Sequence, residues 1–188
     1  LNYKKNIGEQ VLQSSLFYRS RKDKIERLRV PYEAGVTLDS MANVGNDHAL
    51  GMELSGQFIV NKWWNLNVNG NVYYYKVVNN INAGGKEETS TNYDITVNNL
   101  LRICKNTRIQ LDGNFVGPSV TTQGRSDSFW FVNLAIRQQW FGSNLQSTLS
   151  FRDIFNSARY KNDITTPNLE SVTHIRPKFP VITLSISY

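Results

Sequence analysis

Few residues of this 188-residue chain have the types and spacing that catalysis or metal binding requires. A Ser–His–acid hydrolase would have to use His48 or His174, which are its two histidines and lie in or next to expected long loops, outside any nucleophile motif. Cys104 is the single cysteine, in a predicted short turn, so an internal disulfide or a cysteine-based metal cluster is excluded. We therefore expect no enzyme activity, no catalytic, cofactor-binding or metal-binding residues and no cofactor, and the sequence does not identify ligand-binding residues.

Basic residues gather in one segment, residues 19–29. The chain holds 21 Lys and Arg against 15 Asp and Glu, a formal net charge of +6, and acidic residues are mixed into this segment. A nucleic-acid-binding domain usually combines a basic stripe with a recognisable motif, and the sequence has no such motif. We interpret the segment as a solvated charged loop and expect no nucleic-acid partner.

The strongest pattern is an alternation of apolar and polar side chains with a period of two. Between Trp64 and Tyr74 the even-numbered positions are apolar or glycine, whereas four of the odd-numbered positions are asparagine. Successive side chains of a β-strand point to opposite faces, so this segment is predicted to be a strand with one apolar and one polar face. The same reading predicts eight strands and no amphipathic helix, at residues 10–21, 48–60, 64–74, 91–103, 108–117, 128–141, 145–153 and 182–188.

The connections between these strands alternate in length. Short, turn-prone connections fall at 61–63, 104–107 and 142–144, and long polar ones at about 22–47, 79–90, 118–127 and 154–178. Antiparallel strands with short turns at one end and long loops at the other are typical of outer-membrane β-barrels. The sequence therefore predicts an all-β fold, an antiparallel transmembrane β-barrel.

Aromatic spacing indicates which face meets lipid. Trp130 and Trp140 share a face ten positions apart, as do Trp64 and Tyr74. A tilted strand of that length spans roughly 23 Å, close to the ~25 Å apolar band between the two aromatic girdles of such barrels. The opposite face is rich in Asn, Ser, Thr and Gln, and we expect it to line a wet lumen. Its charged residues are expected to be lumen-wall groups: Arg19, Glu53, Asp94, Arg102, Asp112, Arg137 and Arg152.

Several segments, in this order and spacing, resemble the C-terminal β-barrel portion of Bacteroidetes-type TonB-dependent outer-membrane receptors. The resemblance covers nearly the whole chain, and its last strand ends on an aromatic residue, as such barrels do. The segments that carry it are Leu16–Arg19, Gly51–Ser55, Asn61–Trp64, Leu66–Tyr74, Arg152–Asn156 and the terminal Tyr188.

This resemblance implies a 22-stranded barrel with a plug domain and a TonB box. Residues 1–188 would then be a barrel segment that forms the C-terminal third, without the plug, and residues 1–6 the tail of a preceding strand. The implied function is energised import of a scarce ligand across the outer membrane. The implied partners are outer-membrane lipid and lipopolysaccharide, TonB through the missing N-terminal region, and a surface lipoprotein as a further candidate. The extended motif of SusC-like glycan importers is not apparent after Asn156.

The same resemblance places the long loops at the external rim. Their excess of Lys and Arg, including Lys22, Lys24 and Arg27, would favour an anionic ligand or lipopolysaccharide phosphates. Two alternatives stay open: a complete eight-stranded outer-membrane barrel with a structural or adhesive role, and a soluble β-sandwich that binds a ligand. A signal peptide directly before Leu1 would favour the first of these alternatives.

Overall fold

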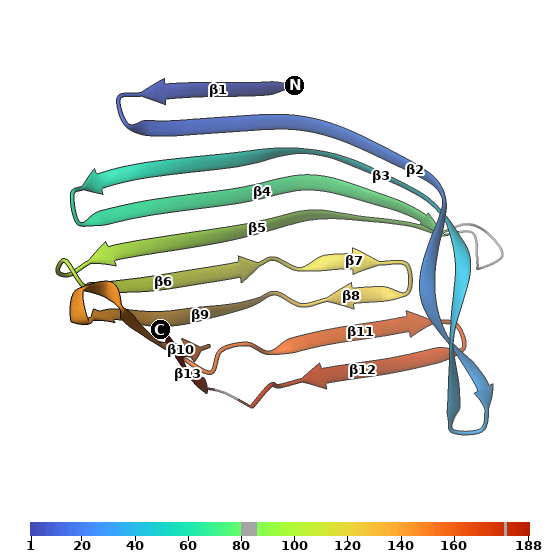
Figure 1. Cartoon of the computed structure of the whole chain (residues 1–188). Helices are drawn as coiled ribbons and strands as arrows, with labels where there is room; N and C mark the ends of the chain where they lie inside the picture. The colour runs from blue at the N-terminus through green and yellow to red at the C-terminus, as the bar shows by residue number, and fades with distance from the viewer. Residues whose placement is uncertain (80–85, 179) are drawn as a thin grey trace.

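The computed structural model describes residues 1–79, 86–178 and 180–188, and in these residues the chain is almost entirely β-structure (Figure 1). The period-two alternation explains this, because it lets each strand present different side chains on its two faces. The strands are β1 (Asn2–Ile7), β2 (Gln10–Glu33), β3 (Val36–Asn61), β4 (Trp64–Asn79), β5 (Lys86–Arg102), β6 (Thr107–Val116), β7 (Ser119–Thr121), β8 (Gly124–Ser126), β9 (Phe129–Trp140), β10 (Leu145–Arg152), β11 (Tyr160–Thr166), β12 (Leu169–Ile175) and β13 (Val181–Ser187).

Nine of these strands form one antiparallel sheet in the order β1-β2-β3-β4-β5-β6-β9-β10-β13. The eight strands predicted from the sequence are all present in it, and the segment expected to be the tail of a preceding strand is β1, which pairs with β2. In the described residues β1 and β13 are the two edges of the sheet. One short 3-10 turn, Phe141–Ser143, connects β9 to β10, and no helix of the described residues is long and apolar enough to cross a membrane.

The connections are sorted by length between the two ends of the sheet. The short turns between β1 and β2, β3 and β4, β5 and β6, and β9 and β10 lie together at one end, on the left of Figure 1. The long hairpins lie at the other end, which we call the hairpin end. Antiparallel pairing of β13 with β10 places Tyr188 at the short-turn end.

The prediction that the long connections are loops was wrong for much of their length. Residues 22–47 continue β2 and β3 as one long hairpin, so the basic segment 19–29 is part of a strand and not a solvated loop. Residues 118–127 and 154–178 contain a second sheet of four strands, in the order β12-β11-β8-β7. Of the loop expected at 79–90, residues 80–85 lie outside the described residues. Beyond the apolar band the chain therefore continues as paired hairpins, in residues that the sequence pattern did not assign to strands.

The hairpin end is bridged by a contact between segments far apart in the sequence. The distal half of the β2–β3 hairpin bends across the ends of the other strands (Figure 1). There the amide of Arg29 donates a hydrogen bond to the side chain of Gln123, between β7 and β8, and the Gln123 side chain donates one to the carbonyl of Arg29, both 2.9 Å long. The small buried core lies at this end, on the inner side of the sheet: Ala49, Tyr75, Val77 and Val120, with Phe17 and Tyr73 packed against it.

A glycine allows the aromatic side chains of this core to approach the sheet. Gly51 lies between its cross-strand partners Phe17 and Tyr73, whose ring centroids are 6.2 Å apart. A Cβ atom at position 51 would lie 2.3 Å from the Cβ atom of Tyr73 and 2.9 Å from the Phe17 ring. A residue with a side chain therefore does not fit at this position without moving the sheet.

Candidate functional site: the two faces of the sheet

One face of the main sheet exposes a continuous apolar band. Leu54 is 47% exposed, Ile95 46% and Leu184 62%, although all three stand in the middle of strands. Exposed aromatic side chains border the band at both ends. At the hairpin end they are Tyr18, Tyr74, Tyr93, Trp130 and Phe155, and at the short-turn end Trp63, Trp140, Phe141 and Tyr188. An apolar band between two aromatic girdles is the surface that a bilayer covers.

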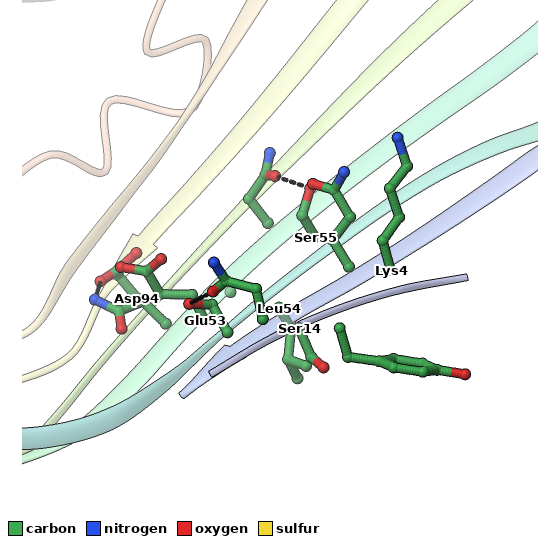
Figure 2. Close-up of a pocket in the computed structure, with 13 residues that line it drawn as sticks. Lys4, Ser14, Glu53, Leu54, Ser55 and Asp94 are labelled. Atoms are coloured by element: carbon green, nitrogen blue, oxygen red, sulfur yellow. Dashed lines mark hydrogen bonds between the residues drawn. The ribbon is translucent and has the colours of Figure 1, made fainter. Parts of the chain in front are cut away.

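The opposite face holds an open cavity of about 670 Å³ over β1 to β5 (Figure 2). Hydroxyl and amide groups from neighbouring strands pair across its wall. Ser55 donates to Asn69 over 2.8 Å, and the Asn71 amide donates to Asp94 over 3.3 Å. Lys4 and Glu53 also line the cavity and make no ion pair among the described residues. Such a wall is wetted and suits polar solutes.

A buried charge cluster lies on this inner side, beyond the girdle. Tyr18, Leu50 and Tyr74 are cross-strand neighbours, and the pair Arg21 and Asp47 lies three positions further toward the hairpin end. The cluster is therefore outside the membrane-spanning part of the strands.

Asp47 is the centre of this cluster and is 1% exposed. Its carboxylate accepts hydrogen bonds from Arg21 Nε and Tyr75 Oη, each 2.9 Å long, and Lys24 Nζ lies 3.3 Å away. Burial pushes the pKa of Asp47 upward, but the bonds from Arg21, Tyr75 and Lys24 together outweigh it and lower the pKa from 3.8 to about 2. Lys24 also pairs with Glu26 and donates to Tyr75. With each charge paired, the cluster joins β2, β3 and β4 as a clasp and leaves no free group for chemistry.

The comparison with known proteins agrees with a sheet that has one apolar, lipid-facing side and one polar side. The model of an outer membrane protein beta-barrel family matches residues 1–188. The chain belongs to this outer membrane protein beta-barrel family. Its members are outer-membrane proteins, so the predicted antiparallel β-barrel and the outer-membrane localisation are confirmed. Neither a curated protein nor a solved structure matches the chain.

Membership of this family assigns the two faces of the sheet to their solvents. In an outer-membrane barrel the apolar face meets lipid and the polar face lines the lumen. The soluble β-sandwich alternative does not fit a chain of an outer-membrane family. In such barrels the short turns face the periplasm and the longer connections face outward, so the hairpin end is external.

The segment Arg152–Asn156 has a structural role in this barrel. It ends β10 and begins a tight loop in which Asp153 and Asn156 adopt positive φ angles, of 48° and 52°. The Asp153 carboxylate, 1% exposed, accepts the backbone N–H groups of Ser157 and Ala158, each over 2.9 Å. The loop directs Phe155 onto Trp130, with ring centroids 6.0 Å apart, and so adds to the outer girdle.

We expect Asp153→Ala to loosen this loop, because two backbone N–H groups lose their acceptor. The expected cost is about 1–3 kcal/mol, the usual penalty for leaving buried polar groups unpaired. Faster hydrogen exchange at Ser157 and Ala158 would report it, with Asp127→Ala, an exposed residue after β8, as the matched control. Unchanged exchange at both amides would contradict the capping role of Asp153.

The structure does not bring the sequence candidates for chemistry together. His48 and His174 were expected in or next to loops, but they lie within β3 and β12. His48 bonds Tyr18 through Nδ1 over 3.0 Å, as part of the outer girdle. Cys104 is exposed in a short turn, as predicted, and its hydrogen bond to Thr107 lowers the pKa of the thiol. The described residues contain no group of three His, Cys, Asp or Glu side chains that could hold a metal ion.

The charged residues expected on the lumen wall lie in β2, β3, β5, β6, β9 and β10, and their alternation places them on the polar face. Of the basic residues expected to face an external anion, Lys22 and Arg27 are exposed. Lys24 is not available for that role, because its side chain is 14% exposed and paired within the clasp. Arg108 lies between Arg102 and Arg137 on neighbouring strands, which the alternation pattern did not predict. The four-residue turn between β5 and β6 was the signal that could have revealed this.

Proposed function

We propose that the chain is the C-terminal part of the barrel of a Bacteroidetes-type TonB-dependent receptor, which imports a scarce ligand into the periplasm. The observation that supports this proposal best is that both edges of the main sheet lack a partner strand among the described residues. Among the described residues, β1 and β13 are edges of a nine-stranded sheet. In hydrocarbon, a free edge leaves backbone N–H and C=O groups without partners. Bacterial single-chain barrels have an even number of strands, so a nine-stranded sheet with two free edges fits part of a larger barrel.

The polar wall and the external mouth of the lumen support a transport role. The polar cavity over β1 to β5 offers hydrogen-bonding groups along the wall. At the external end, the β2–β3 hairpin reaches across to Gln123 and covers part of the mouth. A mouth that is covered by paired hairpins can bind a ligand before it enters the lumen.

The proposal includes partners that lie outside the described chain. A plug domain would occupy the lumen, and TonB would engage a region N-terminal to residue 1. Lipid and lipopolysaccharide would cover the apolar face, and a surface lipoprotein is a further candidate at the external mouth. The proposal assigns the chain no catalytic role and no cofactor.

A growth experiment with the full-length gene product tests the import proposal. Strains are grown in a panel of media, each of which is limited in one nutrient. We expect deletion of the gene and deletion of TonB to cause the same growth defect in one of these media. The double deletion should show no larger defect than either single deletion. A full-length variant without its TonB-contacting segment should reach the outer membrane and still fail to restore growth. A defect that persists unchanged whether or not TonB is present would instead favour a structural or adhesive barrel.

A further inference from the structure

Three arginines form a row across neighbouring strands on the lumen face, near the short-turn end. Arg102 of β5 is the direct cross-strand partner of Arg108 of β6, which is in turn the partner of Arg137 of β9. Adjacent strands lie about 4.8 Å apart, so the row extends over roughly 10 Å. All three side chains are exposed, and none of them makes a hydrogen bond or an ion pair among the described residues.

The surroundings do not neutralise this row. Asp112 lies four residues along β6 from Arg108, about 13 Å at the usual rise per residue, and its carboxylate accepts a bond from Gln110 instead. Glu9 shares a cavity of about 430 Å³ with Arg102, but Lys62 lines the same cavity. Like charges in directly opposed positions destabilise a sheet, so the row gains stability when an anionic group binds to it.

We propose that this arginine row docks an acidic polypeptide segment inside the lumen. The row is wider than one carboxylate, so the segment must carry at least two acidic side chains that guanidinium groups bind in bidentate fashion. Next to Arg137, Gln139 and Gln146 form a cross-strand pair on the same face. Side-chain amides both donate and accept hydrogen bonds, as peptide groups do, whereas a phosphate group offers mainly acceptors. This favours a polypeptide over a phosphate-bearing ligand.

The inference goes beyond the import proposal, because a lumen segment can dock in a barrel of any function. The growth tests with TonB and the crosslinking test of the arginine row therefore have independent outcomes. A negative growth result leaves the docking unaffected, and a negative docking result leaves import unaffected.

Site-specific photo-crosslinking in the full-length protein tests the docking. A photo-reactive residue replaces Thr148, which is the cross-strand partner of Arg137 on β10 and has no role in the proposal. After irradiation of outer membranes, we expect mass spectrometry to find the adduct on a polypeptide segment with at least two neighbouring Asp or Glu residues. The variant R102Q/R108Q/R137Q should lower the adduct yield about tenfold or more, as the loss of charge-assisted bonds implies.

The variant K22Q/R125Q/R159Q is the matched control, because it removes three exposed basic residues outside the row. It should keep the adduct yield of the unmodified protein. Raising the salt concentration should lower the yield in the protein with all its arginines, and this measurement needs no variant to fold. An adduct on lipopolysaccharide or on a segment poor in acidic residues, or a yield that neither the arginine substitutions nor salt change, would overturn the proposal.

Discussion

Leu184→Arg is expected to destabilise the barrel by about 2–4 kcal/mol, the usual cost of an arginine on the lipid face near the middle of the bilayer. Leu184 lies within β13 on the apolar face and is 62% exposed in the chain. For a residue exposed to water such a change would be almost neutral, so the large effect arises only if hydrocarbon covers this face. Denaturant titration of the full-length protein folded into lipid vesicles measures the free energy of unfolding.

The matched control is Ser185→Arg, one residue along the same strand and on the lumen face. At this position the guanidinium group remains in water, so little destabilisation is expected. The comparison holds the strand and, nearly, the depth constant and changes the solvent that the introduced arginine meets. Equal effects of the two substitutions would mean that the assignment of lipid and water to the two faces is wrong.

Asp47→Asn is expected to release the distal half of the β2–β3 hairpin. The substitution leaves Arg21 and Lys24 beside a neutral amide that cannot pair with their charges. Removing one partner of a buried ion pair usually costs on the order of 3–5 kcal/mol. Hydrogen exchange of the β2 amides, or tryptic cleavage within residues 22–29 on the cell surface, measures the loosening. Asp39→Asn is the control, because the Asp39 carboxylate pairs with Arg29 on the same hairpin and is far more exposed than that of Asp47.

The clasp also predicts a pH dependence. Because the pKa of Asp47 is lower in the folded protein, about 2 against an ordinary 3.8, the carboxylate stabilises the hairpin above pH 4. This stabilisation is lost as the pH falls through the folded pKa. Protection of the β2 amides should therefore be constant between about pH 7 and 4, decrease from there toward pH 2, and lack this decrease in Asp47→Asn. A decrease of the same size in both proteins would exclude Asp47 as the titrating group.

The membrane-spanning part of the fold could be predicted from the sequence because bilayer and lumen impose period-two alternation on each strand. Trp64 to Tyr74 shows this pattern, and the structure has β4 there. Neighbouring strands pair in chain order between β1 and β6, as expected for antiparallel strands that are joined alternately by short turns and long connections. The segment Arg152–Asn156 was also recognisable in the sequence through the family resemblance, but the hydrogen bonds by which Asp153 caps the loop appear only in the tertiary structure.

Beyond the aromatic girdle at the hairpin end, the sequence pattern no longer predicted the strands. Neither face of a surface hairpin meets lipid, so no regular apolar alternation is imposed on it, and the β2–β3 extension, which buries Leu28 and Val44, was interpreted as a loop. The contact between Arg29 and Gln123 joins residues 94 positions apart, and no local pattern encodes it. The clasp likewise depends on which residues of three strands meet on the inner side.

The sequence by itself determined that the chain alternates apolar and polar residues, and therefore that it forms strands with a lipid face and a water face. The tertiary structure decided which charges meet. Strand register brings Arg102, Arg108 and Arg137 side by side and brings Arg21 to Asp47. The physical reason is that alternation records the solvent on each side of a single strand, whereas register depends on turn geometry and on bulges such as the one between Arg21 and Lys24.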